Sequence, residues 1–462
     1  MKIADKNTKA VDLVREAFEK AKQYEDYNCF ISTNEMEALN RAKEIDERIE
    51  RGENVGRLAG VPYALKDNYS SHNGATTAAS HMLEEYFAPI TATAVKKLED
   101  EGAIMIGRTN LDAFAHGGST ENSYFGPTKN AYDKERVAGG SSGGSAVSVA
   151  LDIVQFALGS DTGGSIRQPA SFNGVYGVKP TFGTVSRYGV VAMASSTDTM
   201  GCFAKTADDA DLIMKIMSGK DEKDSTTLDD FWTQDIAEIK PSKGKIALIK
   251  DALGEGIDPE VAKCVRDYAD KLKKAGFEIE EVEMPILKYS LAIYYVVTPA
   301  EIASNLARFD GIRYGHRTNE FEELSDIYNN TRSEGFMPEN KRRIMIGNFV
   351  LSSGFFDAYY LKAQKARTLL INAFNEQFEK YDALLCPVAP SPAFKIGENT
   401  NDPVKMYLED ILTVPASLAG LAAISVPAGK TSNGLPIGAQ LIGARQSDQM
   451  LLSIAKRVEE QA

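Results

Sequence analysis

Histidine, cysteine and tryptophan are scarce in this sequence, which has four histidines, four cysteines and one tryptophan in 462 residues. No two histidines stand three or four positions apart, and no HExxH motif occurs, so the sequence argues against a zinc site. We therefore expect no metal in this chain. The cysteines form no CxxC pair, which is typical of reduced, buried thiols in a cytoplasmic protein; they are Cys29, Cys202, Cys264 and Cys386.

The sequence also lacks long apolar runs and an excess of basic residues. No apolar run reaches the ~18 residues of a membrane-spanning helix. The opening stretch, "MKIADKNTKAVDLVREAF", has no apolar core of the kind found in a secretory signal. The net charge is −13, and so acidic a surface is poorly suited to nucleic acid. We expect a cytoplasmic protein with no membrane contact; if RNA takes part, another chain should supply the basic face.

Helical and strand-like patterns alternate along the chain, which predicts an α/β protein with a mostly parallel or mixed sheet covered by helices. The first predicted helix, 7–22, has Asn7 or Thr8 as its cap. The predicted helix 258–276 has Asp258 as its cap and Pro259 in its first turn. Other helices are predicted after Asn34 and at 91–102, 359–381 and 447–461, and strands at 103–108, 244–250, 277–284, 382–387, 422–429 and 436–443.

Domain boundaries are not evident. A length of 462 residues allows about three domains, but no linker, internal repeat or low-complexity tract divides the chain. Two polar segments, 219–243 and 317–342, interrupt the regular pattern. They are either surface loops with short helices, or one of them is a lid over a cleft.

Two glycine–serine clusters joined by an apolar run occupy residues 139–170, "GGSSGGSAVSVALDIVQFALGSDTGGSIRQPA". Neither cluster has the Gly-Lys-Ser/Thr ending of a P-loop or the GxGxxG spacing of a dinucleotide turn, so a nucleotide site is not favoured. A serine–histidine–aspartate set is possible in principle, since distant residues can meet, but it would have to use one of four isolated histidines, and such histidines are more often structural than catalytic.

A serine paired with a neutral lysine is the remaining chemistry. Lys66 ends the apolar run of "VPYALK", where a strand would sit. Burial lowers the pKa of a lysine, and a neutral lysine can take a proton from a serine. A lysine at a strand edge that reaches water fits this local pattern equally well, and both interpretations stay open on the local pattern alone.

The stretches "ALKDN", "GGSSGGS" and "GSDTGGSIRQPA" stand in the order and at the spacing of the amidase signature family, which this chain resembles. The resemblance implies one domain, 1–462, with a central mixed β-sheet of about eleven strands covered by helices on both faces. It also implies catalytic roles: Ser165 is the nucleophile, and Ser141 bridges Ser165 to Lys66 after a cis peptide bond from Gly140.

The resemblance assigns the oxyanion hole to the backbone N–H groups of the second cluster. These are expected to come from Thr162, Gly163, Gly164 and Ser165. Asp161 and Arg167 flank this loop and are expected to brace it. A scaffold protein with a dead site would lack one of the three catalytic residues, and all three are present.

Further stretches, among them "STENSYFGPTKNAYD" and "KRRIMIGNFVLSSGFFDAYYLKAQKAR", resemble one branch of the family, the A subunits of glutamyl-tRNA(Gln)/aspartyl-tRNA(Asn) amidotransferases. This implies glutamine hydrolysis and delivery of ammonia to a B subunit, which amidates mischarged Glu-tRNA(Gln), with Asp-tRNA(Asn) as an open alternative. ATP and Mg²⁺ are expected at the B subunit, which holds most of the tRNA, and a C subunit completes a heterotrimer. No cofactor is expected in this chain.

Glutamine selectivity requires a cation for the α-carboxylate and an anion for the α-ammonium. The resemblance assigns these roles to Arg343 and Asp410. It also implies a tyrosine as the third substrate-binding residue, for which Tyr294 is the first choice and the neighbouring Tyr295 the second. A stand-alone amidase of the same family would share the catalytic residues without this set. His116 stands where methionine is expected in the branch.

Overall fold

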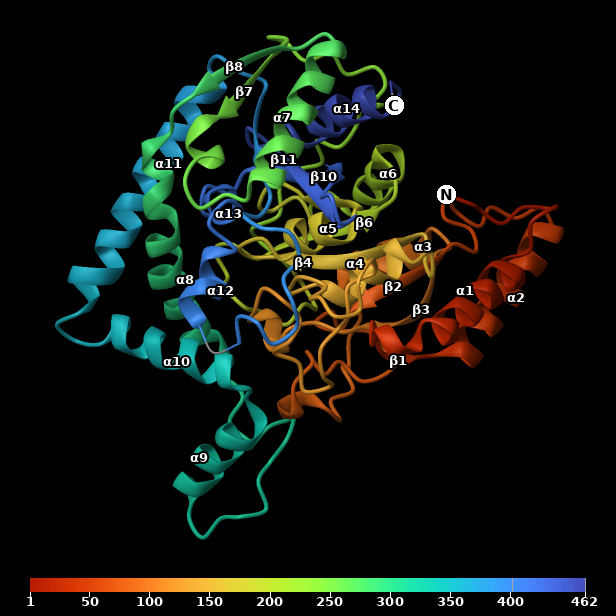
Figure 1. Ribbon diagram of the computed structural model, residues 1–462. Coiled ribbons are helices and arrows are strands. Elements are labelled where there is room, and N and C mark those ends of the chain that lie inside the picture. The colour runs from red at the N-terminus through yellow and green to blue at the C-terminus, as the bar shows by residue number, and fades with distance from the viewer. Residues whose placement is uncertain (401, 462) are drawn as a thin grey trace.

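The computed structural model describes residues 1–400 and 402–461. A single mixed sheet of eleven strands runs through the molecule, in the order β1-β3-β2-β4-β6-β5-β10-β11-β9-β7-β8 (Figure 1). Four neighbouring pairs are parallel, β2–β3, β2–β4, β7–β8 and β7–β9, and the predicted α/β fold with about eleven strands is confirmed. The strands are β1 Phe30–Thr33, β2 Pro62–Lys66, β3 Ile104–Thr109, β4 Phe156–Asp161, β5 Tyr176–Lys179, β6 Thr199–Ala204, β7 Lys245–Ile249, β8 Glu278–Val282, β9 Ala383–Pro387, β10 Ala422–Lys430 and β11 Pro436–Gly443.

The described residues form fourteen α-helices, and none of these helices is long and apolar enough to span a bilayer. In Figure 1, α1 and α2 lie beside the β1 end of the sheet, whereas α8, α10 and α11 lie on the opposite side of the molecule. The helices are α1 Ala10–Gln23, α2 Glu35–Glu50, α3 Thr93–Asp100, α4 Gly143–Ala150, α5 Arg167–Asn173, α6 Ala207–Met217, α7 Pro259–Lys274, α8 Ser290–Leu306, α9 Leu324–Gly335, α10 Pro338–Leu351, α11 Lys362–Phe378, α12 Pro403–Leu408, α13 Val414–Leu418 and α14 Asp448–Glu459. The short helices are η1 Glu25–Tyr27, η2 His81–Leu83, η3 Ala113–Ala115, η4 Lys250–Leu253, η5 Pro285–Tyr289 and the π-helix η6 Phe356–Leu361.

Helix α7 begins as the sequence predicts. The Asp258 carboxylate accepts a hydrogen bond from the Glu260 N–H at 2.7 Å, and Pro259 occupies the first turn, where its missing N–H is not needed. Lysines lie in the last turn of the helix, where they interact favourably with the unpaired carbonyl groups. Local signals are therefore sufficient to position this helix.

The predicted cap of α1, Asn7 or Thr8, is wrong. The helix begins after Lys9, which makes no capping hydrogen bond through its side chain. Instead, the Asp46 carboxylate of α2 accepts from the Ala10 N–H at 2.7 Å and from the next N–H at 3.2 Å. A tertiary contact therefore satisfies the unpaired N–H groups at this end, and a local sequence pattern cannot reveal it.

The two polar segments differ in structure. Residues 219–243 contain no helix or strand among the named elements. Trp232 and Ile236 of this segment are buried, and the Trp232 ring N–H donates to Asp211 Oδ1 at 2.6 Å. Residues 317–342 contain α9 and the start of α10, and α9 projects from the body of the molecule in Figure 1. The predicted helix 359–381 starts within η6 and continues as α11.

The carboxyl ends of β2 and β4 meet at one edge of the sheet because these strands are parallel neighbours. Lys66 ends β2 and Asp161 ends β4, and both side chains are fully buried. Helix α4 begins at Gly143, inside the first glycine–serine cluster, and α5 begins at Arg167, just after Ser165 of the second cluster. The fold thus brings the predicted lysine and both serine clusters to one place.

Candidate active site

Lys66 lies at the centre of a group of serine hydroxyls. Its Nζ is 2.9 Å from Ser141 Oγ and 2.7 Å from Ser142 Oγ. It is also 3.0 Å from Ser160 Oγ. The side chain is buried, so the strand-edge interpretation, in which this lysine reaches water, is wrong.

Burial lowers the pKa of Lys66 from 10.5 to about 7, although the charges of Asp112, Asp161 and Asp198 raise it. Removing an ammonium from water disfavours its charged form, and here this effect exceeds the attraction of the three carboxylates. A large fraction of the amine is therefore neutral near pH 7 and is able to accept a proton. A neutral amine beside a hydroxyl is the arrangement that serine–lysine chemistry requires.

The Gly140–Ser141 peptide bond is cis, as predicted. The Gly140 N–H donates to Gln168 Oε1 at 2.9 Å, and the Ser141 carbonyl accepts from the Asp112 N–H at 3.2 Å. A Cβ on Gly140 would lie 2.2 Å from Asp112 Oδ2 and 2.6 Å from the Ser119 backbone nitrogen. Only glycine fits here, because neighbouring groups approach the backbone this closely.

Ser165 stands in the loop between β4 and α5 and is 8% exposed. Its carbonyl accepts from the Ser142 N–H at 3.1 Å, which ties the two clusters together. No hydrogen bond joins the Ser165 and Ser141 hydroxyls among the contacts of residues 1–400 and 402–461. The bridge between them stays a prediction.

The loop before Ser165 leaves backbone donors unused. Within the described residues, no acceptor pairs with the N–H groups of Gly163, Gly164 or Ser165. The Thr413 hydroxyl donates to the Gly163 carbonyl at 2.6 Å, and this contact fixes the direction of the peptide. Gly164 has φ +149°, and a Cβ there would lie 2.3 Å from Thr413 Oγ1. Free, oriented N–H groups beside a serine are suited to stabilising a developing oxyanion.

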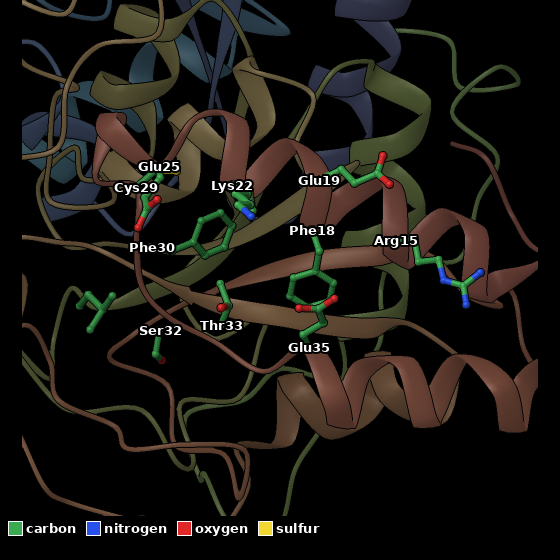
Figure 2. A pocket seen from close by; sticks show the side chains of 12 residues that line it. Arg15, Phe18, Glu19, Lys22, Glu25, Cys29, Phe30, Ser32, Thr33 and Glu35 are labelled. Atoms are coloured by element: carbon green, nitrogen blue, oxygen red, sulfur yellow. The ribbon is translucent and has the colours of Figure 1, made fainter.

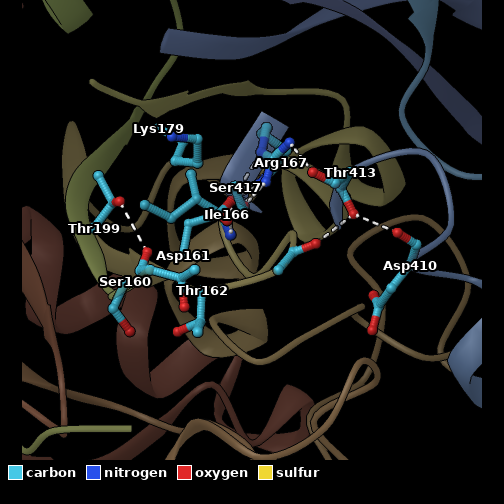
Figure 3. Close-up of polar contacts among 12 residues, drawn as sticks. Ser160, Asp161, Thr162, Ile166, Arg167, Lys179, Thr199, Asp410, Thr413 and Ser417 are labelled. Atoms are coloured by element: carbon cyan, nitrogen blue, oxygen red, sulfur yellow. Dashed lines mark hydrogen bonds and ion pairs between the residues drawn. The ribbon is translucent and has the colours of Figure 1, made fainter. Parts of the chain in front are cut away.

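Asp161 and Arg167, which flank this loop, form a buried ion pair (Figure 3). Arg167 Nη2 donates to Asp161 Oδ1 at 2.8 Å and Nε donates to Oδ2 at 3.0 Å. The same guanidinium donates to the Thr413 carbonyl and to the Ser417 hydroxyl, both at 2.8 Å. Burial raises the pKa of Asp161, but Arg167 and the other donors lower it by more, so the net pKa lies below the usual value. The pair connects the Ser165 loop to the segment that follows Asp410, so it braces the site.

A pocket of about 240 Å³ is lined by two of the expected substrate-binding residues, Arg343 and Asp410. Arg343 is 3% exposed, and its Nε donates to Glu339 Oε1 at 2.8 Å. Its guanidinium carbon lies 5.4 Å and 5.8 Å from the ring centres of Tyr295 and Tyr407. Burial raises the pKa of Asp410 to about 7, although Arg343 lowers it. The pocket thus presents a cation and a titratable carboxyl.

The two neighbouring tyrosines have different places. Tyr295 lines the pocket, and its hydroxyl donates to Asp410 Oδ2 at 3.5 Å. Tyr294 packs against the loop instead, since a Cβ on Gly163 would lie 2.7 Å from its hydroxyl oxygen. The sequence favours Tyr294 without fixing the register of the pair. The structure brings both to the site, with Tyr295 nearer the charged groups of the pocket.

Several polar neighbours were missed from the sequence or given no role. Ser142 and Ser160 contact Lys66, and their positions within the two serine clusters were the only available signal. Glu339 pairs with Arg343 from one turn earlier on α10, an i,i+4 spacing that could have been noticed. His116 is buried, its Nδ1 lies 2.7 Å from Asn340 Nδ2, and burial holds its pKa well below the usual value. His116 is therefore neutral.

A larger cavity of about 730 Å³ lies elsewhere, between α1 and β1. Figure 2 shows Arg15, Phe18 and Glu19 of α1 on one side of it and Phe30 and Thr33 of β1 on the other. None of the expected catalytic or substrate-binding residues lines it. No cluster of three or more potential metal ligands occurs in the part of the chain that the structure describes.

Comparison with known proteins gives strong matches over nearly the whole chain. The family model described as amidase matches residues 12–452. The A subunit of glutamyl-tRNA(Gln) amidotransferase from Carboxydothermus hydrogenoformans is 50% identical, over 99% of this chain and 95% of that protein. The protein of the same name from Streptococcus mutans is 49% identical, over 99% of this chain and 94% of that protein.

Solved structures agree with this match. The crystal structure of the A subunit of glutamyl-tRNA(Gln) amidotransferase from Thermotoga maritima is 41% identical, with a TM-score of 0.81, and covers 98% of this chain and 92% of its own. A structure described as an amidase is 29% identical, with a TM-score of 0.83, and covers 98% of this chain and 96% of its own. Sequence, fold and site geometry lead to one assignment, and this chain belongs to the amidase signature family of enzymes.

Proposed function

We propose that this chain is the glutaminase subunit of a tRNA-dependent amidotransferase. The observation that carries the proposal is the buried Lys66 amine, held against Ser141 at 2.9 Å beside unused backbone donors. The chain is 50% and 49% identical in sequence to two amidotransferase A subunits, and this similarity supports glutamine as the amide that is hydrolysed.

In the proposed reaction, Ser165 is the nucleophile. Its hydroxyl proton passes through Ser141 to neutral Lys66, while the Ser165 oxygen attacks the side-chain carbonyl carbon of glutamine. The N–H groups of Thr162, Gly163, Gly164 and Ser165 stabilise the resulting oxyanion. The proton then returns from Lys66 to the leaving nitrogen, and ammonia departs. Water then attacks the carbonyl carbon of the γ-glutamyl ester and gives a proton through Ser141 to Lys66; the bond to Ser165 Oγ breaks, the proton returns to that oxygen, and glutamate leaves.

The substrate's two α-groups have partners in the pocket. Arg343 is placed to hold the α-carboxylate, because a guanidinium presents two parallel donors. Asp410, when ionised, holds the α-ammonium. Tyr294 and Tyr295 complete the site from α8, one against the oxyanion loop and the other against the charged groups. Arg343 exchanges part of its contact with Glu339 for the substrate.

The partners follow from the relatives, which are named as the A subunits of amidotransferases. We infer that the whole chain, 1–462, is one amidase domain that works with B and C subunits in a heterotrimer. Ammonia passes to the B subunit, which uses ATP and Mg²⁺ to amidate Glu-tRNA(Gln), with Asp-tRNA(Asn) as the alternative substrate. The −13 net charge supports placing most of the tRNA contacts on the partner. Four buried free cysteines support a cytoplasmic location.

The test uses the full chain co-expressed with its B and C subunits. Ser165→Ala should abolish ammonia release from glutamine, while amidation of Glu-tRNA(Gln) from added ammonium salts should continue at a rate close to that of the wild-type complex. Glutamine hydrolysis that persists in Ser165→Ala would refute the nucleophile assignment. A wild-type complex that hydrolyses simple amides but not glutamine would identify a general amidase instead.

A further inference from the structure

The side-chain amide of Gln168 is buried, and only one of its two polar atoms makes a hydrogen bond within the described residues. Gln168 lies on α5, one turn after Ser165, and is fully buried. Its Oε1 accepts the Gly140 N–H at 2.9 Å, which fixes the orientation of the amide. Its Nε2 has no hydrogen-bond partner among the described residues. A buried donor without an acceptor is unfavourable, so such a group calls for an explanation.

The unused Nε2 and the carboxyl group that is expected to hold the substrate both lie near Gly118. A Cβ built on Gly118 would be 3.6 Å from Gln168 Nε2 and also 3.6 Å from Asp410 Oδ1. Gly118 itself lines the pocket. The two polar atoms therefore both border the space that a side chain on Gly118 would fill. A second unpartnered polar atom, Glu121 Oε2, belongs to another residue that lines the same pocket.

We propose that Gln168 is a further substrate-binding residue, whose Nε2 donates a hydrogen bond to an α-carboxylate oxygen of glutamine while Asp410 holds the α-ammonium. The inference rests on the proposed function. An α-amino acid carries both groups on one carbon, so an acceptor and a donor that border the same space beside Gly118 match its two charges. Arg343 binds the other carboxylate oxygen.

The absence of a side chain on Gly118 is part of this site. A Cβ there would make only ordinary contacts, the nearest at 3.6 Å, and Gly118 has no positive φ. Gly118→Ala should therefore fold normally, yet it places a methyl group beside both Gln168 and Asp410, where the substrate's α-carbon would lie. This variant tests the position of the substrate without touching either polar residue.

The decisive variant is Gln168→Glu, measured at pH 8.5 in the full chain assembled with its B and C subunits. A carboxylate keeps the acceptor for the Gly140 N–H but removes the Nε2 donor. The variant therefore tests the donor while the contact with Gly140 is retained. We expect the KM for glutamine to rise by at least about 10- to 150-fold, the range for losing a hydrogen bond to a charged group, because the new carboxylate also repels the α-carboxylate of the substrate. Turnover of butanamide, which is glutamine with its α-ammonium and α-carboxylate each replaced by hydrogen, should change less than about threefold, since it depends on the catalytic residues alone.

The outcomes separate this inference from the proposed function. A raised KM for glutamine in both Gln168→Glu and Gly118→Ala, with butanamide turnover retained, supports the role of Gln168. An unchanged KM in Gln168→Glu, while the wild type hydrolyses glutamine, overturns the inference and leaves the proposed function standing. Equal losses on glutamine and butanamide also overturn it, because they assign Gln168 to the support of Gly140. A wild type that hydrolyses butanamide but not glutamine overturns both.

Discussion

The protonation of Lys66 should determine how activity depends on pH. The base must be neutral, and burial lowers the pKa of Lys66 from 10.5 to about 7. At pH 8 a lysine of pKa about 7 is ~90% neutral, whereas one at 10.5 is only ~0.3% neutral, so burial raises the amount of usable base roughly 300-fold. Activity should rise with pH, reach half of its maximum near pH 7, and level off at higher pH. An ordinary lysine would give a rise that continues beyond pH 9.

Butanamide is the substrate for this assay, because glutamine binding adds a second titration. Asp410 also has a pKa of about 7, and its protonation would weaken glutamine binding over the same pH range. Butanamide has no α-ammonium and avoids this effect. The value of kcat/KM for butanamide between pH 5.5 and 10 should therefore report Lys66, and Lys66→Arg should lose about 10²–10⁴-fold or more at every pH, because a guanidinium stays protonated.

Lys179 provides a matched control. It is a second fully buried lysine whose pKa burial lowers to about 7, but its Nζ donates to the carbonyls of Pro180 and Leu421 rather than to serines. Lys179→Met should leave the midpoint of the butanamide profile near 7. A midpoint that moves in Lys179→Met, a wild-type midpoint above pH 9, or near-normal rates in Lys66→Arg would each refute the base role of Lys66.

Three further predictions concern the pocket and the oxyanion loop. Arg343→Ala should raise the KM for glutamine about 10- to 150-fold with little effect on butanamide, and equal losses on both would assign Arg343 to the fold. The KM for glutamine should rise as the pH falls below 7, because Asp410 becomes protonated, and Asp410→Asn should remove this dependence; a dependence that survives would contradict the role. Gly164→Ala places a Cβ 2.3 Å from Thr413 Oγ1 and should lower the free energy of unfolding in urea by about 1–3 kcal/mol more than Gly434→Ala, which also has positive φ but has no atom near its Cβ; equal losses in the two variants would show that the loop yields to the methyl group.

The elements that local signals define were predictable, and α7 is the clearest case, with Asp258 as its cap and Pro259 in its first turn as expected. The start of α1 was not, because Asp46 satisfies its N–H groups from another helix. Amphipathic periodicity indicates which face of a helix is buried, but it does not indicate which distant side chain completes its end.

The candidate active site was also predictable only in part. Glycine–serine clusters and a lysine after an apolar run were visible in the sequence, and family resemblance gave Lys66, Ser141 and Ser165 their roles, which stay predictions. The contact of Ser160 with Lys66 was not visible, because it depends on β2 and β4 lying in register. Nor was the different placement of Tyr294 and Tyr295, which depends on the rotation of α8.

The central claim is that Ser165 forms a covalent ester with glutamine, and trapping that ester tests it most directly. The wild-type complex is mixed with glutamine, quenched in acid within milliseconds and digested, and the peptides are mapped by mass spectrometry. The account predicts a γ-glutamyl adduct on the peptide that contains Ser165, absent in Ser165→Ala. An adduct on Ser141 would reverse the two serine roles, and rapid ammonia release with no adduct on either serine would contradict covalent catalysis by this site.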